Sequence, residues 1–218
     1  MPRESIASRR SRAVQLLEAL RAVYPEAHCE LVYQTPLQLL IATILSAQCT
    51  DARVNKVTPA LFQRCGTAAD FVEIPREELE HFIHSTGFYR AKAKNIQGCC
   101  RALMERHGGE VPRTLGELTS LPGVGRKTAN VVLAEVFNHC EGVVVDTHVL
   151  RLSKWFRWAK GSQAESVERE LMALLPDEHW LGISHWLIWH GRRRCSARHP
   201  DCERCEVRDL CPSRATKG

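Results

Sequence analysis

The chain has 218 residues, 44% of them hydrophobic, which is enough to bury one large core or two smaller ones and argues against disorder. Its apolar runs are far shorter than the roughly 20 residues of a membrane-spanning helix, and the basic N-terminus lacks a secretory signal, so we expect a cytoplasmic protein with no membrane partner. The formal net charge is +5, and from Gly191 onward there are eight basic and four acidic residues, which is typical either of a polyanion-binding segment or of a solvated basic tail.

Helical periodicity dominates the first half of the chain. Apolar residues recur at helical spacing from Ser11 to Tyr24, and Thr35-Pro36 is a start signal for a buried, nearly all-apolar helix. Further helices are predicted over Asp51–Cys65, Arg76–His84 and Arg90–His107. Pro59 is expected to kink or split the first of these three.

The second half of the chain shows the same period. Helical patterns follow Arg126 and Thr147 and cover Glu165–Leu175 and Trp180–His190. The β-branched run Gly142–Val145 is too short to build a sheet. All five tryptophans lie in the last third, which suggests a separately packed C-terminal core. We therefore predict an all-α chain with two core regions.

Four of the ten cysteines have a ligand spacing. They are separated by six, two and five intervening residues, so one compact loop can bring four thiolates together. Four thiolates suit a structural zinc or an iron-sulfur cluster equally well by spacing alone. The four are Cys195, Cys202, Cys205 and Cys211. The other six are interpreted as small buried hydrophobes: Cys29, Cys49, Cys65, Cys99, Cys100 and Cys140.

A glycine-bearing turn, Leu121-Pro-Gly-Val-Gly-Arg-Lys-Thr-Ala129, precedes an apolar helix predicted from Thr128 to Phe137. It is not a nucleotide P-loop, because Arg126 interrupts the required Gly-Lys-Ser/Thr and no strand precedes it. Gly123 and Gly125 allow the backbone to approach a phosphate, and the amides of a helix N-terminus are donors for it. This is the physics of a helix-hairpin-helix, which holds a DNA backbone without reading its sequence.

Lys127 and Asp146 are the candidate reactive residues. Lys127 follows the predicted phosphate contact, where its amine can reach the sugar of the bound strand; alone, it would be read as a solvated lysine. Asp146, in Val143-Val-Val-Asp-Thr-His148, follows a short apolar run and precedes a helix, so it is also a natural N-cap. Capping and catalysis are compatible.

These three motifs together resemble the endonuclease III family of DNA glycosylases. The resemblance extends to Leu45-Ser-Ala-Gln48 with Thr50-Asp51, and to Gly87-Phe-Tyr89 before Lys92-Ala-Lys-Asn-Ile96, and covers nearly the whole chain. It implies a two-domain helix-hairpin-helix glycosylase fold with a 4Fe-4S cluster held by the four C-terminal cysteines. The implied domains are a six-helix barrel over 29–139 with the hairpin, and a discontinuous iron-sulfur domain of 1–28 and 140–218.

The activity implied by the resemblance is base-excision repair of double-stranded DNA by a monomer associated with the nucleoid. A bifunctional glycosylase and abasic-site (AP) lyase would remove oxidised pyrimidines, with uncharged Lys127 attacking C1′ and a Schiff base leading to β-elimination. Asp146 would stabilise the cationic sugar. Arg126 is a candidate for keeping the amine uncharged.

Further contacts follow from the same resemblance. Gly123, Val124, Gly125 and Arg126 would hold the DNA backbone, Gln48 would fill the gap left by the flipped base, and Phe88 would wedge the opposite strand, although relatives usually have an aliphatic wedge. His148 would line the site and Asp51 would border the pocket. The structural alternatives are a polar helix end for Gln48, core packing for Phe88, a helix-terminus histidine for His148 and a helix cap for Asp51. The cluster would order the loop that has Arg198, Arg204 and Arg208 as phosphate contacts.

Two rival functions differ in their chemistry. A monofunctional mismatch or uracil-type glycosylase would use water as the nucleophile, which Lys127 argues against. A non-catalytic iron-sulfur or zinc DNA-binding module would need neither Lys127 nor Asp146.

Overall fold

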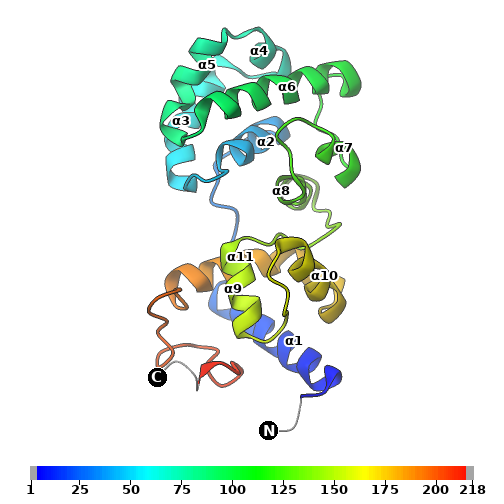
Figure 1. Ribbon diagram of the computed structural model, residues 1–218, viewed down its shortest axis with the longest axis vertical. Helices are drawn as coiled ribbons and strands as arrows, with labels where there is room; N and C mark the ends of the chain where they lie inside the picture. The colour runs from blue at the N-terminus through cyan, green and yellow to red at the C-terminus, as the bar shows by residue number, and fades with distance from the viewer. Residues whose placement is uncertain (1–3, 215–218) are drawn as a thin grey trace. The chain divides into compact units, whose positions relative to one another are not determined.

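The computed structural model describes residues 4–214. Within this range the regular structure is α-helix with two short 3-10 helices, and no strand is formed (Figure 1). The chain divides into two compact units. The terminal unit consists of Met1–Cys29 and Cys140–Gly218, and the central unit of Glu30–His139. No helix of the described part is long and apolar enough to cross a membrane.

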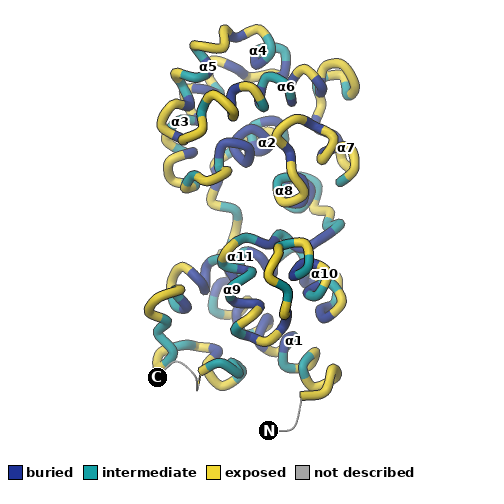
Figure 2. Tube along the Cα trace, viewed as in Figure 1, coloured by how far each residue is buried: buried dark blue, intermediate teal, exposed yellow. Residues whose placement is uncertain are grey.

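The central unit is built around α2 (Pro36–Leu45). Thr35 caps this helix by accepting from the amide of Gln38, and Pro36 takes its first position, as the start signal predicts. Eight of its ten residues are buried, so Figure 2 shows it almost entirely in the colour of buried residues. The surrounding elements are α3 (Asp51–Arg64), α4 (Ala68–Glu73), α5 (Arg76–Ile83), η1 (His84–Thr86), α6 (Tyr89–His107), α7 (Leu115–Thr119) and α8 (Arg126–Phe137).

The terminal unit joins the two ends of the chain in one core. Its elements are α1 (Ile6–Val23), α9 (Thr147–Trp155), α10 (Ala164–Leu174), η2 (Asp177–His179) and α11 (Trp180–Arg193). Leu16, Leu17 and Leu20 of α1 pack with Ile183 and Leu187 of α11 in one cluster of buried residues. The predicted C-terminal core is therefore completed by the N-terminal helix, and all five tryptophans contribute to it.

Several helix boundaries differ from the predictions. The first helix begins at Ile6, not at Ser11, because Ser5 caps it by accepting from the amide of Ser8. The helix α3 continues through Pro59, so the predicted split does not occur. Two short helices, α4 and α7, were not predicted; each begins at a threonine cap and is too short to show a helical repeat.

Candidate catalytic and nucleic-acid-binding site

The hairpin turn between α7 and α8 depends on Gly123. Its φ is +76°, and an added Cβ would lie 2.6 Å from the Cβ of Asn95 on α6. The amide of Val124 donates to the carbonyl of Leu121 at 3.1 Å and closes the turn. Gly125 has an ordinary φ of −86°, and an added Cβ would meet open space. The fold therefore requires glycine at 123, whereas at 125 glycine leaves room for something outside the chain.

Lys127 is the second residue of α8, nearer the turn than the predicted helix start at Thr128 placed it. Gly125 is the N-cap and offers no side-chain cap, and the first turn contains no acidic residue. Arg126 and Lys127 are both exposed. An uncapped helix start with two basic residues concentrates positive charge and amide donors at one point. This arrangement is suited to an anion.

Asp146 caps α9. Its Oδ1 accepts from the amide of Val149 at 2.8 Å, and its side chain is half-buried at the surface of the terminal unit. The predicted structural role of Asp146 is therefore confirmed. Capping uses one carboxylate oxygen, so a role toward a substrate stays compatible with it.

His148 is the second residue of α9 and is half-buried. Burial lowers the pKa of His148, an effect that the neighbouring Arg151 reinforces and Asp146 opposes. The guanidinium of Arg151 lies 3.2 Å from Nδ1 of His148. An added Cβ on Gly191 of α11 would lie 2.7 Å from this Nδ1, so Gly191 makes room for the pair.

Gln48 and Phe88 lie at the tips of two loops in the central unit. Both adopt the left-handed conformation, with φ of 53° and 48°. For residues other than glycine this costs about 1–3 kcal/mol each and is concentrated at functional sites. The side chain of Phe88 is 67% exposed, so the core-packing interpretation of Phe88 is wrong. Gln48 is exposed as well.

Asp51 does not cap α3, contrary to the structural alternative. Thr50 is the N-cap and accepts from the amide of Arg53 at 3.3 Å, while Asp51 is the first residue of the helix. A negative charge in the first turn complements the helix dipole. Its predicted place beside the pocket stays a prediction.

The four C-terminal cysteines lie in a segment that follows α11 and lacks helix or strand. Cys195 is buried, and Cys202, Cys205 and Cys211 are half-buried. Burial raises the pKa of Cys205 and of Cys211, and Cys202 raises both further. Among residues 4–214, no group of three or more histidine, cysteine or acidic side chains is arranged to hold a metal ion.

A buried histidine lies against this segment. The ring of His190 is fully buried, and burial lowers its pKa to about 4, so it is neutral at pH 7. Its Nδ1 is 3.1 Å from the hydroxyl of Tyr24, and its Nε2 is 3.7 Å from Sγ of Cys205. His190 therefore joins Tyr24 of the first helix to one of the four cysteines. Of the six remaining cysteines, Cys65, Cys99 and Cys100 are buried as predicted; Cys29, Cys49 and Cys140 are only half-buried.

Ion pairs order the same segment. Arg194 contacts the carboxylates of Asp201 and Glu206 at 2.9 and 2.8 Å. Of the three predicted phosphate contacts, Arg204 pairs with Asp201 at 3.0 Å and Arg208 lies 3.7 Å from Asp209. Arg198 is exposed. The carboxylates reduce the positive charge that this loop presents.

Comparison with known proteins decides the family. A model of the HhH-GPD superfamily of base excision DNA repair proteins matches residues 41–177, which include the hairpin and Asp146. The chain belongs to this superfamily. The family predicted from the motifs is thereby confirmed, and with it the helical fold class and base excision repair as the function.

Relatives of this HhH-GPD protein match it over nearly its whole length. Endonuclease III of Synechocystis sp. is 55% identical over 208 residues, which are 95% of each chain. A solved structure of a trapped endonuclease III–DNA covalent intermediate has a TM-score of 0.90 and 45% identity, covering 95% of this chain and 97% of that one. A thermostable thymine-DNA glycosylase has a TM-score of 0.85 at 21% identity, covering 96% and 99%, and so shows the fold alone.

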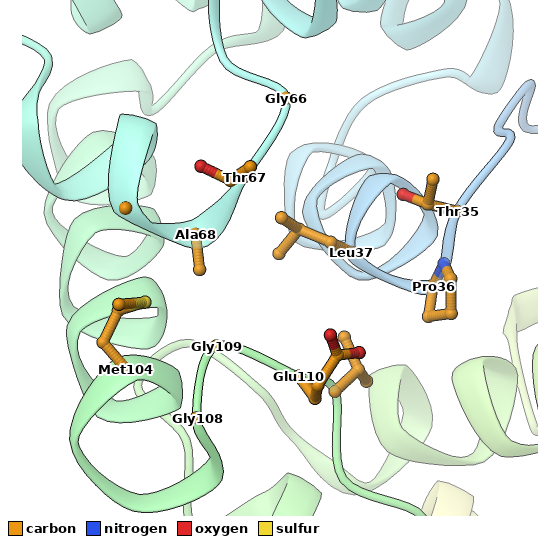
Figure 3. Close-up of a pocket in the computed structure, with 12 residues that line it drawn as sticks. Thr35, Pro36, Leu37, Gly66, Thr67, Ala68, Met104, Gly108, Gly109 and Glu110 are labelled. Atoms are coloured by element: carbon orange, nitrogen blue, oxygen red, sulfur yellow. The ribbon is translucent and has the colours of Figure 1, made fainter.

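A pocket of about 560 Å³ in the central unit of this HhH-GPD protein is separate from these residues. It opens between the start of α2, the turn before α4 and the end of α6, and Figure 3 shows Glu110 in its wall. None of the predicted site residues is among those that line it. A carboxylate disfavours a phosphate there, so we do not assign the DNA site to this pocket.

The sequence did not single out Asn95 or Arg151. Asn95 supports Gly123 from α6. The guanidinium of Arg151 donates to the carbonyls of Gly191 and Cys195 at 3.1 and 3.0 Å and so links α9 to the cysteine segment. Both roles depend on residues far away in the chain, and no local pattern signals them.

Proposed function

We propose that this HhH-GPD protein is a bifunctional DNA glycosylase and AP lyase, acting as a monomer on double-stranded DNA with oxidised pyrimidines or abasic sites. The observation that carries the proposal is an exposed lysine in the first turn of an uncapped helix, directly after the Gly123 turn. Relatives named endonuclease III and a solved covalent endonuclease III–DNA intermediate support it. A DNA substrate puts the protein at the nucleoid within the cytoplasm.

The proposed reaction begins with the damaged nucleotide outside the stack, because C1′ is shielded within it. The uncharged amine of Lys127 bonds to C1′ as the bond from C1′ to the base nitrogen breaks, and the base leaves with the electron pair and takes a proton. The nitrogen loses one proton, its lone pair forms the C1′=N bond of a protonated Schiff base as the C1′–O4′ bond breaks, and O4′ takes a proton. Loss of a C2′ proton then expels the 3′ phosphate, and water hydrolyses the Schiff base to regenerate Lys127.

Asp146 acts on the charge that develops in this reaction. As the base departs the sugar becomes cationic, and a carboxylate stabilises that cation better than a neutral amide does. Its cap to the amide of Val149 fixes one oxygen. In this proposal the other oxygen serves the substrate and passes protons. His148, whose pKa is lowered by burial, would offer a hydrogen-bonding ring nitrogen near it.

The remaining contacts to DNA come from the central unit. Gly123, Val124, Gly125 and Arg126 would hold the phosphate backbone through amides and one guanidinium. Gln48 would enter the gap left by the extruded base, and Phe88 would separate the opposite bases. The exposure of both tips supports these roles. Asp51 would border the lesion pocket.

The four cysteines fit a 4Fe-4S cluster by donor chemistry. Cys195, Cys202, Cys205 and Cys211 offer an all-sulfur set, and Cys202 raises the pKa of both Cys205 and Cys211, a repulsion that bound iron would relieve. These four side chains would hold the cluster, which would cross-link the segment that follows α11. The ordered loop would then place Arg198, Arg204 and Arg208 toward phosphates. Visible absorption of the purified protein tests the cofactor, because a zinc-thiolate site is colourless and an iron-sulfur cluster is coloured.

Borohydride trapping on an oligonucleotide with one abasic site tests the function. Only an amine nucleophile leaves protein covalently attached to DNA after reduction. Wild-type protein should give the attached species and Lys127→Ala should not. Lys56→Ala, which removes an equally exposed positive charge from α3, should behave as wild type. No attached species with wild-type protein would favour a monofunctional glycosylase or a non-catalytic module, and an undiminished one with Lys127→Ala would refute the assignment.

A further inference from the structure

Lys92 is a buried lysine that the proposed chemistry does not use. It lies in the first turn of α6, and only 5% of the residue is exposed. Its Nζ donates to the carbonyl of Leu45 at 2.7 Å and to the carbonyl of Thr86 at 2.8 Å. Leu45 is itself fully buried and Thr86 is 2% exposed. One side chain therefore joins two segments that are 41 residues apart in the chain.

Both carbonyls lie at the ends of helices. Leu45 is the last residue of α2, and Thr86 is the last residue of η1. The terminal carbonyls of a helix have no partner within it, and a cation there complements the helix dipole. Lys92 thus donates a hydrogen bond to the last carbonyl of each helix, where the helix ends and a loop begins.

The two loops that begin there are the ones with left-handed tips. Gln48 follows Leu45 by three residues, and Phe88 follows Thr86 by two. Each tip has a positive φ, which a residue with a side chain adopts only where its surroundings hold it. The Nζ contacts fix the base of both loops at once.

Packing alone does not explain an ammonium at this place. Burial lowers the pKa of Lys92, with the thiol of Cys49 acting in the opposite direction, so the fold works against the charged form. An unbranched apolar side chain could fill the same volume without that penalty. What such a side chain lacks is the pair of donors.

The same helix also supports the hairpin. Asn95, three residues after Lys92, lies against Gly123, and Gly98 lies against the ring of Pro122 with an added Cβ at 3.3 Å. Residues 92, 95 and 98 are spaced by three, so they follow one side of α6. This side of α6 connects the two loop bases to the turn that precedes Lys127.

We propose that Lys92 is a positioning residue that locks the Gln48 loop and the Phe88 loop to each other, so that both tips enter a damaged duplex as one unit. The inference rests on the proposed function, because it assumes that these tips contact DNA. It predicts a defect in lesion recognition rather than in holding the DNA backbone, since the hairpin residues are untouched.

The test compares Lys92→Met with Lys94→Met in the intact protein. Lys94 is exposed on the same helix, so both variants lose one positive charge and gain the same side chain. Affinity is measured for an undamaged duplex and for one with a tetrahydrofuran abasic analogue, and 2-aminopurine opposite the analogue reports unstacking. Lys92→Met should lose about 10-fold in preference for the abasic duplex and most of the fluorescence rise. Lys94→Met should keep both, and the two variants should bind the undamaged duplex within about twofold of each other.

Lys92→Gln, together with the melting temperatures of the variants, distinguishes a positioning role of Lys92 from a general loss of stability. Lys92→Gln retains two N–H donors on a shorter stem and should recover part of the preference; it also replaces Lys92→Met in the test if that variant does not fold. The proposal would be overturned if Lys92→Met kept the wild-type preference and fluorescence rise, or if it lost affinity equally for both duplexes. Borohydride trapping by wild-type protein would still uphold the proposed function in either case. A wild-type protein that neither traps nor prefers the abasic duplex would overturn both.

Discussion

The starts of α8 and α9 solve the same problem in opposite ways. Every helix begins with amides that have no partner inside it. At α9 the carboxylate of Asp146 accepts from one of them, so the chain satisfies its own helix. At α8 the cap residue is Gly125, which offers no side chain, and Arg126 and Lys127 follow with no acidic residue in that turn.

This difference distinguishes a helix start that its own side chain stabilises from a helix start whose amides are proposed to bind a ligand. A basic first turn without a cap is unfavourable for an isolated helix, by a few tenths to about 1 kcal/mol for each feature. A chain selected only for stability would place serine, threonine or aspartate at position 125, as it does at the starts of α2 and α9. Under the proposed function, the start of α8 would be completed by a bound phosphate.

The largest effect is expected where the cap and the proposed catalytic group coincide. Asp146→Asn keeps an N-cap of nearly equal quality and removes the charge, so stability should stay within about 0.5 kcal/mol of wild type. The rate of base removal should fall at least about 100-fold, because the cationic sugar loses its counter-charge. Single-turnover rates and urea denaturation check both. A variant that loses stability but little rate would make Asp146 a cap alone.

The Gly123 turn should show the next largest effect. Gly123→Ala forces a side chain into a positive φ and against the Cβ of Asn95, so unfolding should require about 2 kcal/mol less. Gly125→Ala meets open space at an ordinary φ and should cost nothing measurable. Urea denaturation of both variants tests the distinction, and equal costs would refute it.

An artificial cap at the start of α8 should raise the stability of the protein and lower its affinity for DNA. Gly125→Asp supplies an acceptor and a negative charge at the helix start, so stability should rise by about 0.5 kcal/mol. Affinity for an undamaged duplex should fall about 10-fold, because the carboxylate occupies the position of a phosphate. Gly125→Ser adds the cap without the charge and should lose less affinity. Unchanged binding in both variants would remove the start of α8 from the DNA site.

The smallest effect concerns His148 beside the α9 cap. Since burial lowers the pKa of His148, the unfolded chain binds a proton at a higher pH than the folded chain does. Stability from this residue is thus complete above the unfolded pKa, near 6.5, and declines as the pH falls toward the lower folded pKa. His148→Gln should show a shallower loss of stability between pH 7.5 and pH 5.5 in urea denaturation. An identical slope in wild type and variant would contradict this.

The sequence was sufficient where a signal is local. Thr35-Pro36 and Asp146 predicted their caps because a cap needs only a polar side chain and the amides two or three residues later. The short helices α4 and α7 were not predicted, because five or six residues do not complete two helical turns and so show no periodicity. Thr50, rather than Asp51, caps α3 because two adjacent polar residues both suit the position and only the backbone decides between them.

Features that depend on contacts between distant segments could not be predicted from the sequence. Phe88 combines an exposed side chain with a left-handed backbone, and the sequence of a non-glycine residue rarely signals such a backbone. The burial of Lys92 follows from two carbonyls that come together only in the folded chain. At the proposed site, the roles that the sequence and its family resemblance assign to residues stay predictions, and the structure adds how the backbones of these residues are held.

The central claim is that the amine of Lys127 bonds to the sugar of damaged DNA. Mass spectrometry of the borohydride-trapped complex, after digestion of the protein and the DNA, identifies the modified residue directly. The account predicts a single adduct of the reduced sugar on Lys127. An adduct on any other residue would contradict it.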